Sequence, residues 1–218
     1  MGCWNIEGAY EDANNVKINK LEDETFLKIL RKFDILCLQE THLAQDEIPT
    51  TCSNYVPISH CRGFSSNNRH FGGMLLLVKK SIRGLIEVRK DFDKDLMEII
   101  LNRKVFNLNE DKRILFLYAS PFNSSYTKSR DSTIIEKFET KDACCRNALV
   151  LGDLNGRTGR VEDFVRDDID KHCPVDNPLY MRDSFLSRNN SDCNPVDQQG
   201  KLVLDLCGLD HEIEEVTI

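Results

Sequence analysis

The heptapeptide Leu-Val-Leu-Gly-Asp-Leu-Asn, at positions 149–155, joins an apolar run to a glycine and two polar side chains. An apolar run bounded by a turn residue predicts a buried strand, and Gly152 lets the backbone turn tightly where that strand ends. If the chain is still extended there, alternation places Asp153 and Asn155 on one side. Asp153 can bind a hard cation or orient an imidazole, and Asn155 can donate to a phosphate oxygen. Gly-Asp turns also end many strands for structural reasons alone, so this motif needs support from the rest of the chain.

Length and composition indicate one globular domain over residues 1–218. The 218 residues are 40% hydrophobic and 30% charged, and they are enough to bury a sizeable core. A net charge of −7 excludes a global basic field, so any contact with nucleic acid must come from a local patch. The longest apolar runs, at 74–78 and 114–119, are too short to span a bilayer, and no signal peptide is evident. We therefore expect an intracellular protein, nuclear or cytoplasmic, with no membrane partner.

The nine cysteines include no C-x-x-C pair, which is typical of reduced thiols in an intracellular protein. His172, Cys173 and Cys193 share a polar region, but their spacing matches no common zinc pattern. We interpret their proximity in sequence as incidental.

Apolar runs and periodicity predict an α/β order of elements along the chain. An amphipathic helix of about three turns is expected to end near Phe33, after a loop over residues 9–20. A second helix is expected over 128–147, and residues 156–199 are expected to be mostly loop. Strands are expected at residues 2–8, 34–39, 54–57, 74–78, 96–101, 114–118 and 149–152.

Polar residues with phosphate or metal chemistry stand at or beside the ends of separate predicted strands. Each has a structural alternative: an edge strand for Asn5, an exposed loop carboxylate for Glu40, and a packed aromatic for Tyr118. Converging from different strands, they would build one site. The set is Asn5, Glu40, Tyr118, Asp153 and Asn155. A basic cluster over residues 79–90 could contact a phosphate backbone or form a solvated face.

Four motifs occur in the order found in the endonuclease/exonuclease/phosphatase superfamily, which the chain resembles from its first residues to about Cys207. They are Trp4-Asn5-Ile6, Leu38-Gln39-Glu40-Thr41, Tyr118-x-x-Pro121 and Gly152-Asp153-x-Asn155. Three stretches further resemble the endonuclease domain of non-LTR retrotransposons. They are Gln39-Glu40-Thr41-His42, the run from Gly152 to Gly159, and the run from Gly200 to Cys207.

The resemblance implies a four-layer α/β sandwich of the DNase-I-like class and Mg²⁺- or Mn²⁺-dependent cleavage of phosphodiester bonds in DNA. By position, Glu40 would hold the metal, with Asn5 in or near its shell. Asp153 would orient or activate the attacking water, and Asn155 would contact the scissile phosphate. In a two-metal version, Asp153 and Asn155 would help to hold a second ion. Tyr118 would support the phosphate electrostatically, because preorganised donors stabilise the charge that develops on phosphate.

The family pattern ends with further strands, an Asp that orients a histidine, and a Ser-Asp-His motif that this sequence lacks. Asp210-His211 is a bare dipeptide match that follows the 202–207 segment too closely. The resemblance therefore predicts a C-terminally truncated domain. Two functions remain open: a DNA endonuclease, or an inactive remnant that acts as a binding module or does not fold stably. A phosphatase of lipid or sugar phosphates is a third possibility, which the retroelement-like stretches disfavour.

Overall fold

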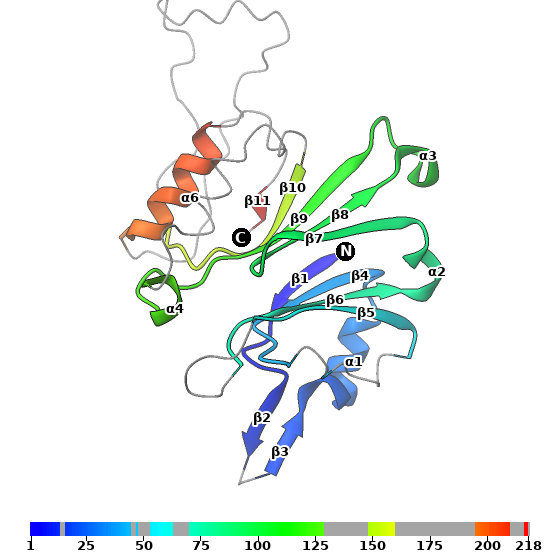
Figure 1. Cartoon of the computed structure of the whole chain (residues 1–218), viewed down its shortest axis with the longest axis horizontal. Helices are drawn as coiled ribbons and strands as arrows, with labels where there is room; N and C mark the ends of the chain where they lie inside the picture. The colour runs from blue at the N-terminus through cyan, green and yellow to red at the C-terminus, as the bar shows by residue number, and fades with distance from the viewer. Residues whose placement is uncertain are drawn as a thin grey trace, which may run out of the picture.

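Two β-sheets packed face to face form the centre of the protein (Figure 1). In the first, the N-terminal sheet, the strand order is β1-β4-β6-β5, and β1 and β4 are parallel while the other pairs are antiparallel. Its strands are β1 (Gly2–Asn5), β4 (Ile35–Gln39), β5 (Tyr55–His60) and β6 (Met74–Lys79). The computed structural model describes residues 1–13, 16–44, 47, 53–62, 70–128, 148–159, 195–209 and 216–217.

The second, the C-terminal sheet, has the order β11-β10-β9-β8-β7. An antiparallel meander of three strands continues into the parallel pairs β9/β10 and β10/β11. Its strands are β7 (Ile86–Asp93), β8 (Leu96–Leu101), β9 (Lys112–Tyr118), β10 (Ala148–Asp153) and β11 (Val216–Thr217). A separate hairpin pairs β2 (Tyr10–Ala13) with β3 (Val16–Asn19).

Buried apolar side chains form three clusters, one between the two sheets and one on the outer face of each sheet. Between the sheets, Phe116 and Met97 of the C-terminal sheet pack with Leu76 of the N-terminal sheet. All five residues of β4 are buried because alternate side chains face the opposite sheet or the helix behind it. Burial on both faces explains why this strand reads as an unbroken apolar run.

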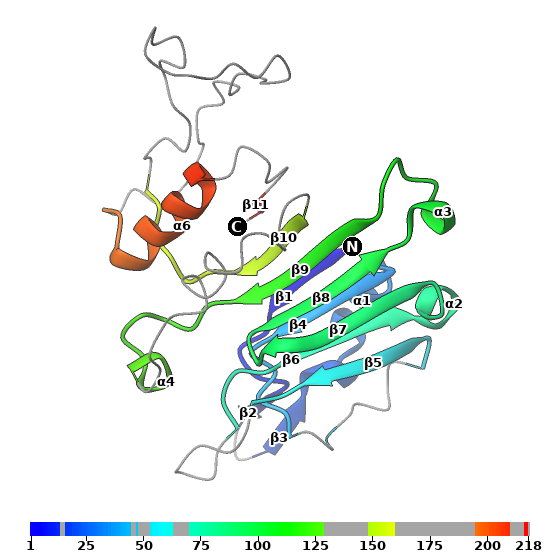
Figure 2. The same ribbon diagram turned by 45° about the horizontal axis from the view of Figure 1, so that its top comes forward.

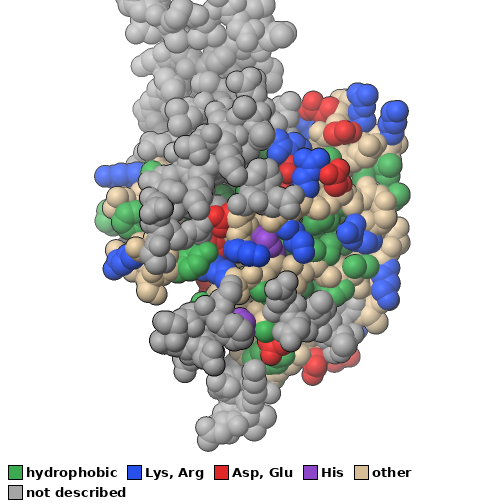
Figure 3. Space-filling view, viewed as in Figure 1, with side chains coloured by type: hydrophobic (Ala, Val, Ile, Leu, Met, Phe, Trp, Pro, Cys, Tyr) green, Lys and Arg blue, Asp and Glu red, His purple; other side chains and the backbone are tan. Residues whose placement is uncertain are grey.

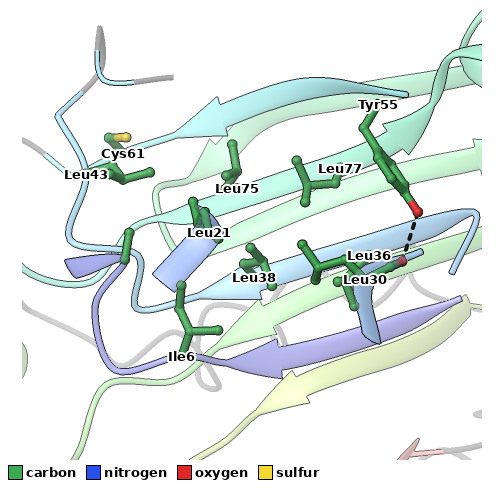
Figure 4. Packing of buried hydrophobic residues seen from close by; sticks show 11 residues of the cluster. Ile6, Leu21, Leu30, Leu36, Leu38, Leu43, Tyr55, Cys61, Leu75 and Leu77 are labelled. Atoms are coloured by element: carbon green, nitrogen blue, oxygen red, sulfur yellow. Dashed lines mark hydrogen bonds between the residues drawn. The ribbon is translucent and has the colours of Figure 1, made fainter. Parts of the chain in front are cut away.

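The outer faces of the two sheets are each covered by helix. Behind the N-terminal sheet, Leu30 of α1 (Glu24–Leu30) packs on Leu36 and Leu38, and the hydroxyl of Tyr55 donates to Leu30 O at 2.8 Å (Figure 4). On the C-terminal sheet, Val203 of α6 (Gln198–Leu209) packs in the cluster around β9 and β10, and both views place α6 beside β10 (Figures 1 and 2). The remaining helical segments are η1 (Lys20–Glu22), α2 (Lys80–Arg83), α3 (Arg103–Phe106) and α4 (Ser125–Lys128).

This arrangement of helix, sheet, sheet and helix confirms the predicted α/β sandwich. No helix in the described part of the chain has the length and apolar character needed to cross a membrane.

Several local predictions were wrong. Residues 9–20 were expected to be loop, but they contain the β2/β3 hairpin. The first helix is shorter than expected, because Asp23 caps it by accepting from the backbone N–H groups of Thr25 and Phe26. Strand β7 and helix α3 were not anticipated.

The first strand also differs from the prediction, since β1 ends at Asn5 and Glu7 turns with a φ of 50°. Trp4 is 37% exposed and stacks on Phe26 with the ring centroids 4.9 Å apart. Most of the predicted 128–147 helix and of the 156–199 loop lies outside the described residues. So do His172, Cys173, Cys193, Asp210 and His211.

Phe116 tests the packing between the sheets, because it is fully buried at the centre of that layer. Replacing Phe116 with Ala should lower the free energy of unfolding by about 3–5 kcal/mol, through lost burial and the cavity left behind. Urea denaturation measures this change. Val105→Ala is the control, because Val105 is 47% exposed and should shift stability by no more than about 0.5 kcal/mol. Equal effects of the two substitutions would contradict the assigned core.

Candidate active site

The carboxyl ends of four strands meet at one edge of the sandwich. Asn5 at the end of β1 pairs with Gln39 at the end of β4, and Asp153 at the end of β10 pairs with Tyr118 at the end of β9. Parallel pairing brings the ends within each sheet to one level, and the packing of the two sheets brings both pairs together. The polar residues that the sequence placed at separate strand ends are therefore neighbours in space.

The side chain of Asn5 joins the two sheets at this edge. Its Nδ2 donates to Glu40 Oε1 at 3.0 Å and to Asp153 Oδ2 at 2.9 Å. Its Oδ1 accepts from the backbone N–H of Glu7 at 3.0 Å, which fixes the orientation of the amide. Glu7 itself is exposed, as expected of a solvated side chain. One amide group thus holds two carboxylates close to each other.

Tyr118 completes the contacts of Glu40. Its hydroxyl donates to Glu40 Oε1 at 2.5 Å, a short, charge-assisted hydrogen bond. Burial raises the pKa of Tyr118 far above its usual range, and the hydrogen bond to Glu40 raises this pKa further. The phenol therefore keeps its proton and acts as a donor at this site.

Asn155 lies beside Asp153 but does not continue the strand. Its φ of 48° is left-handed, and its backbone N–H donates to Asp153 Oδ1 at 2.9 Å. Its side-chain Nδ2 donates to Ala119 O at 2.9 Å, just past Tyr118. The amide group is thus next to the strand ends, although the extended geometry that would align it with Asp153 is absent.

Left-handed backbone conformations concentrate around this edge. Among the described residues, five non-glycine residues have a positive φ, and four of them are Glu7, Glu40, His42 and Asn155. Such conformations are uncommon for side chains of this size, and they persist where surrounding contacts hold them. The chain therefore maintains strained backbone where the polar side chains converge.

The side chain of Gln39 links the two sheets next to the site, a role that the sequence did not reveal. Its Nε2 donates to Leu117 O and its Oε1 accepts from the backbone N–H of Asp153, both at 2.9 Å. Gln39 is 1% exposed, so these are buried hydrogen bonds between the two sheets. Gly152 is required here, because a Cβ on it would lie 1.8 Å from Leu117 O.

A buried ion pair stands behind Tyr118. Arg62 Nε donates to Asp95 Oδ1 at 2.6 Å, and Arg62 Nη2 donates to Ser120 Oγ at 2.6 Å. The guanidinium also lies over the rings of Tyr126 and Tyr118, at 3.8 and 5.2 Å from their centroids. Nothing in the local sequence around Arg62 links it to Asp95, 33 positions away, or to Ser120, 58 positions away.

His42 was also missed as a neighbour of the site. Its Nε2 lies 3.8 Å from Glu40 Oε2. Burial lowers the pKa of His42, the charge of Glu40 opposes that change, and Arg62 and Lys20 lower the pKa further. The imidazole is therefore neutral at neutral pH.

Helix α6 fixes the segment that follows Asp153. Gln199 Nε2 donates to Leu154 O, and Asp197 Oδ1 accepts from the backbone N–H groups of Arg157 and Gly200. Gly200 allows this close approach, because a Cβ on it would lie 1.9 Å from Arg157 O. Asp197, Gln199 and Gly200, at the start of α6, therefore hold the segment after Asp153 in place.

Two facing sheets between helices, with carboxylates and neutral donors at their shared edge, define an α/β sandwich of the DNase-I-like class. The chain belongs to the endonuclease/exonuclease/phosphatase family, whose model matches residues 2–205. This family includes metal-dependent nucleases and phosphatases.

A solved structure of the human Nocturnin catalytic domain with a bound sulfate anion is similar, at 16% identity and a TM-score of 0.38. The similarity covers 63% of this chain and 59% of the Nocturnin chain, so this chain spans less than two thirds of that domain. None of the curated proteins compared with the sequence matches it.

Gln39→Met tests the link between the sheets, because Met has similar length but cannot replace either hydrogen bond. Each buried backbone group that loses its partner should cost about 1–3 kcal/mol of unfolding free energy. Gln198→Met is the matched control, because Gln198 is exposed on α6 and should change stability little. Urea denaturation of both variants measures the difference, and equal stabilities would refute a structural role for Gln39.

Arg62→Met should be strongly destabilising, because it removes the guanidinium from a carboxylate whose side chain is 2% exposed. We expect a loss of about 3–5 kcal/mol by urea denaturation. The double variant Arg62→Met, Asp95→Leu should recover part of that loss, because no charge is then left buried. A double variant less stable than Arg62→Met would rule out the buried charge as the cause.

Proposed function

We propose that this protein is a metal-dependent endonuclease that hydrolyses phosphodiester bonds in DNA, of the kind found in non-LTR retrotransposons. The observation that carries the proposal is the amide of Asn5 bound to both Glu40 and Asp153. This contact brings together the residues that the family resemblance assigns to metal binding and to water activation.

The residues present fit a divalent cation. Two carboxylates bound to one amide nitrogen repel each other, and a cation between or beside them would relieve that repulsion. Their oxygens are the hard ligands that Mg²⁺ and Mn²⁺ prefer. No group of three or more His, Cys, Asp or Glu side chains among the described residues is placed to hold a metal ion, so water and phosphate oxygens would have to supply the remaining ligands of the cation.

We assign the metal to Glu40, with Asn5 in or near its shell. When bound, the cation supplies positive charge that stabilises the phosphate as negative charge builds up on it. Asn5 orients Glu40 and Asp153 relative to each other through its two hydrogen bonds.

Three further side chains act on the substrate in this proposal. Asp153 accepts a hydrogen bond from the attacking water and orients it toward phosphorus. Asn155 donates to an oxygen of the scissile phosphate, and Tyr118 keeps its proton and adds a neutral donor.

The choice of DNA and of a retrotransposon-like element rests on three sequence stretches. Two of them touch in the fold, because Gly200 lies against Gly156 and Arg157. Through this contact, the stretch from Gly200 to Cys207 helps to position the residues that follow Asp153.

Nicking of supercoiled plasmid by the purified chain tests the proposal. We expect relaxed circles with Mg²⁺ and none with EDTA. Glu40→Gln and Asp153→Asn should each lower the nicking rate by about 100-fold or more, the usual loss when a preorganised polar group is removed from an active site. Circular dichroism shows whether each variant is folded.

Glu24→Gln is the control, because Glu24 lies on α1, its side chain is 75% exposed, and its one ion pair is with Lys28 on the surface. It should nick as the unaltered chain does. Nicking that survives EDTA, or that both site variants retain, would refute the assignment. A folded chain that does not nick would support the inactive-remnant alternative. Release of phosphate from phosphomonoesters without nicking would instead indicate a phosphatase.

A further inference from the structure

An exposed aromatic ring lies at the rim of the candidate site. Phe71 is 49% exposed, and its ring meets the ring of His42 edge to face, with centroids 5.9 Å apart and planes at 74°. His42 in turn lies 3.8 Å from a carboxylate oxygen of Glu40. Phe71 at the surface therefore contacts His42, and His42 lies next to the proposed metal ligand Glu40.

The backbone that carries Phe71 is held in place. The backbone N–H of His42 donates to Gly72 O at 2.9 Å, which continues the pairing of β4 with β6 beyond the strands. Gly72 has a φ of 67°, and a Cβ on it would lie 2.6 Å from Arg62 Nη1. Arg62 is itself fixed by Asp95. Phe71 is thus presented to solvent from a defined position, which lowers the entropy cost of binding a flat partner.

The charge distribution favours stacking over electrostatics as the source of affinity near this site. The chain carries a net charge of −7, and Glu40 and Asp153 add negative charge at the site. The basic residues around α2 lie elsewhere, because Val78 pairs with Ile35, the first residue of β4. Figure 3 shows Lys and Arg side chains on the side where α2 and α3 lie, in the middle of the same face and on its opposite side. The two cations near His42 already have partners, because Arg62 is paired with Asp95 and Lys20 Nζ donates to Ile6 O at 2.8 Å.

We propose that Phe71, backed by His42, is a stacking platform for a nucleobase next to the phosphate that is cleaved. This inference rests on the proposed DNA substrate. An aromatic face binds an unstacked base with little dependence on its identity, and stacking does not depend on counterion release. The partner is therefore a DNA strand whose base is unpaired or displaced at the cleavage position.

Binding of an oligonucleotide tests the platform separately from cleavage. The unaltered chain and Phe71→Ala are titrated into fluorescein-labelled single-stranded DNA in EDTA, at several salt concentrations, and anisotropy gives Kd. Phe71→Ala should raise Kd by about 5- to 150-fold, the range for loss of one stacked base. The slope of log Kd against log salt should stay unchanged, because no phosphate contact is removed.

Two further variants and one probe make the outcome specific. Phe71→Trp should keep the unaltered Kd, because it keeps an aromatic face. Leu85→Ala should also keep it, because Leu85 is 45% exposed and follows α2 at the other end of the sheets. Oligonucleotides with 2-aminopurine should show fluorescence quenching with the unaltered chain and with Phe71→Trp, and less quenching with Phe71→Ala.

An unchanged Kd in Phe71→Ala would overturn the platform, as would a Phe71→Trp variant that binds as weakly as Phe71→Ala. The platform would also be overturned if Kd rose no more in Phe71→Ala than in Leu85→Ala. These results are independent of the nicking assay. Nicking with a normal Phe71→Ala Kd would leave the endonuclease proposal intact and remove the platform. Weak binding by Phe71→Ala in a chain that does not nick would keep the platform and remove the endonuclease.

Discussion

At the site, the buried side chain of Gln39 holds the two sheets in register through two hydrogen bonds. It provides a donor to Leu117 O and an acceptor for the N–H of Asp153, and both partners belong to the opposite sheet. Glutamate would lack the donor, and asparagine would be one methylene shorter, so few residue types can make both contacts. Because Gln39 precedes Glu40 directly, the same side chain sets the relative height of the two carboxylates. The positions of Asn5 and Tyr118 then follow from strand pairing with β4 and β10.

The elements that the sequence predicted well are those buried on both faces. Strands β4 and β6 read as unbroken apolar runs because one face meets the other sheet and the other face meets α1. Glu40 was identified because it follows the buried run of β4. Asn5 ends β1 and Asp153 ends β10, and both of these strands are only partly buried. Their convergence follows from the parallel pairing of β1 with β4 and of β9 with β10, which was not predicted from the sequence.

What the sequence did not reveal depends on partners far along the chain. The β2/β3 hairpin and β7 are rich in charged residues, so local composition favours loop, and only pairing with a neighbouring strand makes them extended. Arg62 finds Asp95 across 33 positions, and no spacing rule connects them. The left-handed conformation of Asn155 likewise arises from its hydrogen bonds to Asp153 and Ala119, since a Gly-Asp-x-Asn sequence is equally compatible with an extended chain.

The balance of charge at the site bears on the proposed cation. The side chains bonded to one another are two carboxylates and two neutral donors, Asn5 and Tyr118. The nearby guanidinium of Arg62 is already paired with Asp95, so it can support the ring of Tyr118 without neutralising Glu40. A phosphate diester approaching this edge would meet net negative charge and would be repelled. A divalent cation on Glu40 would balance the charge of the two carboxylates and remove that repulsion, and the neutral donors could then bind phosphate oxygens.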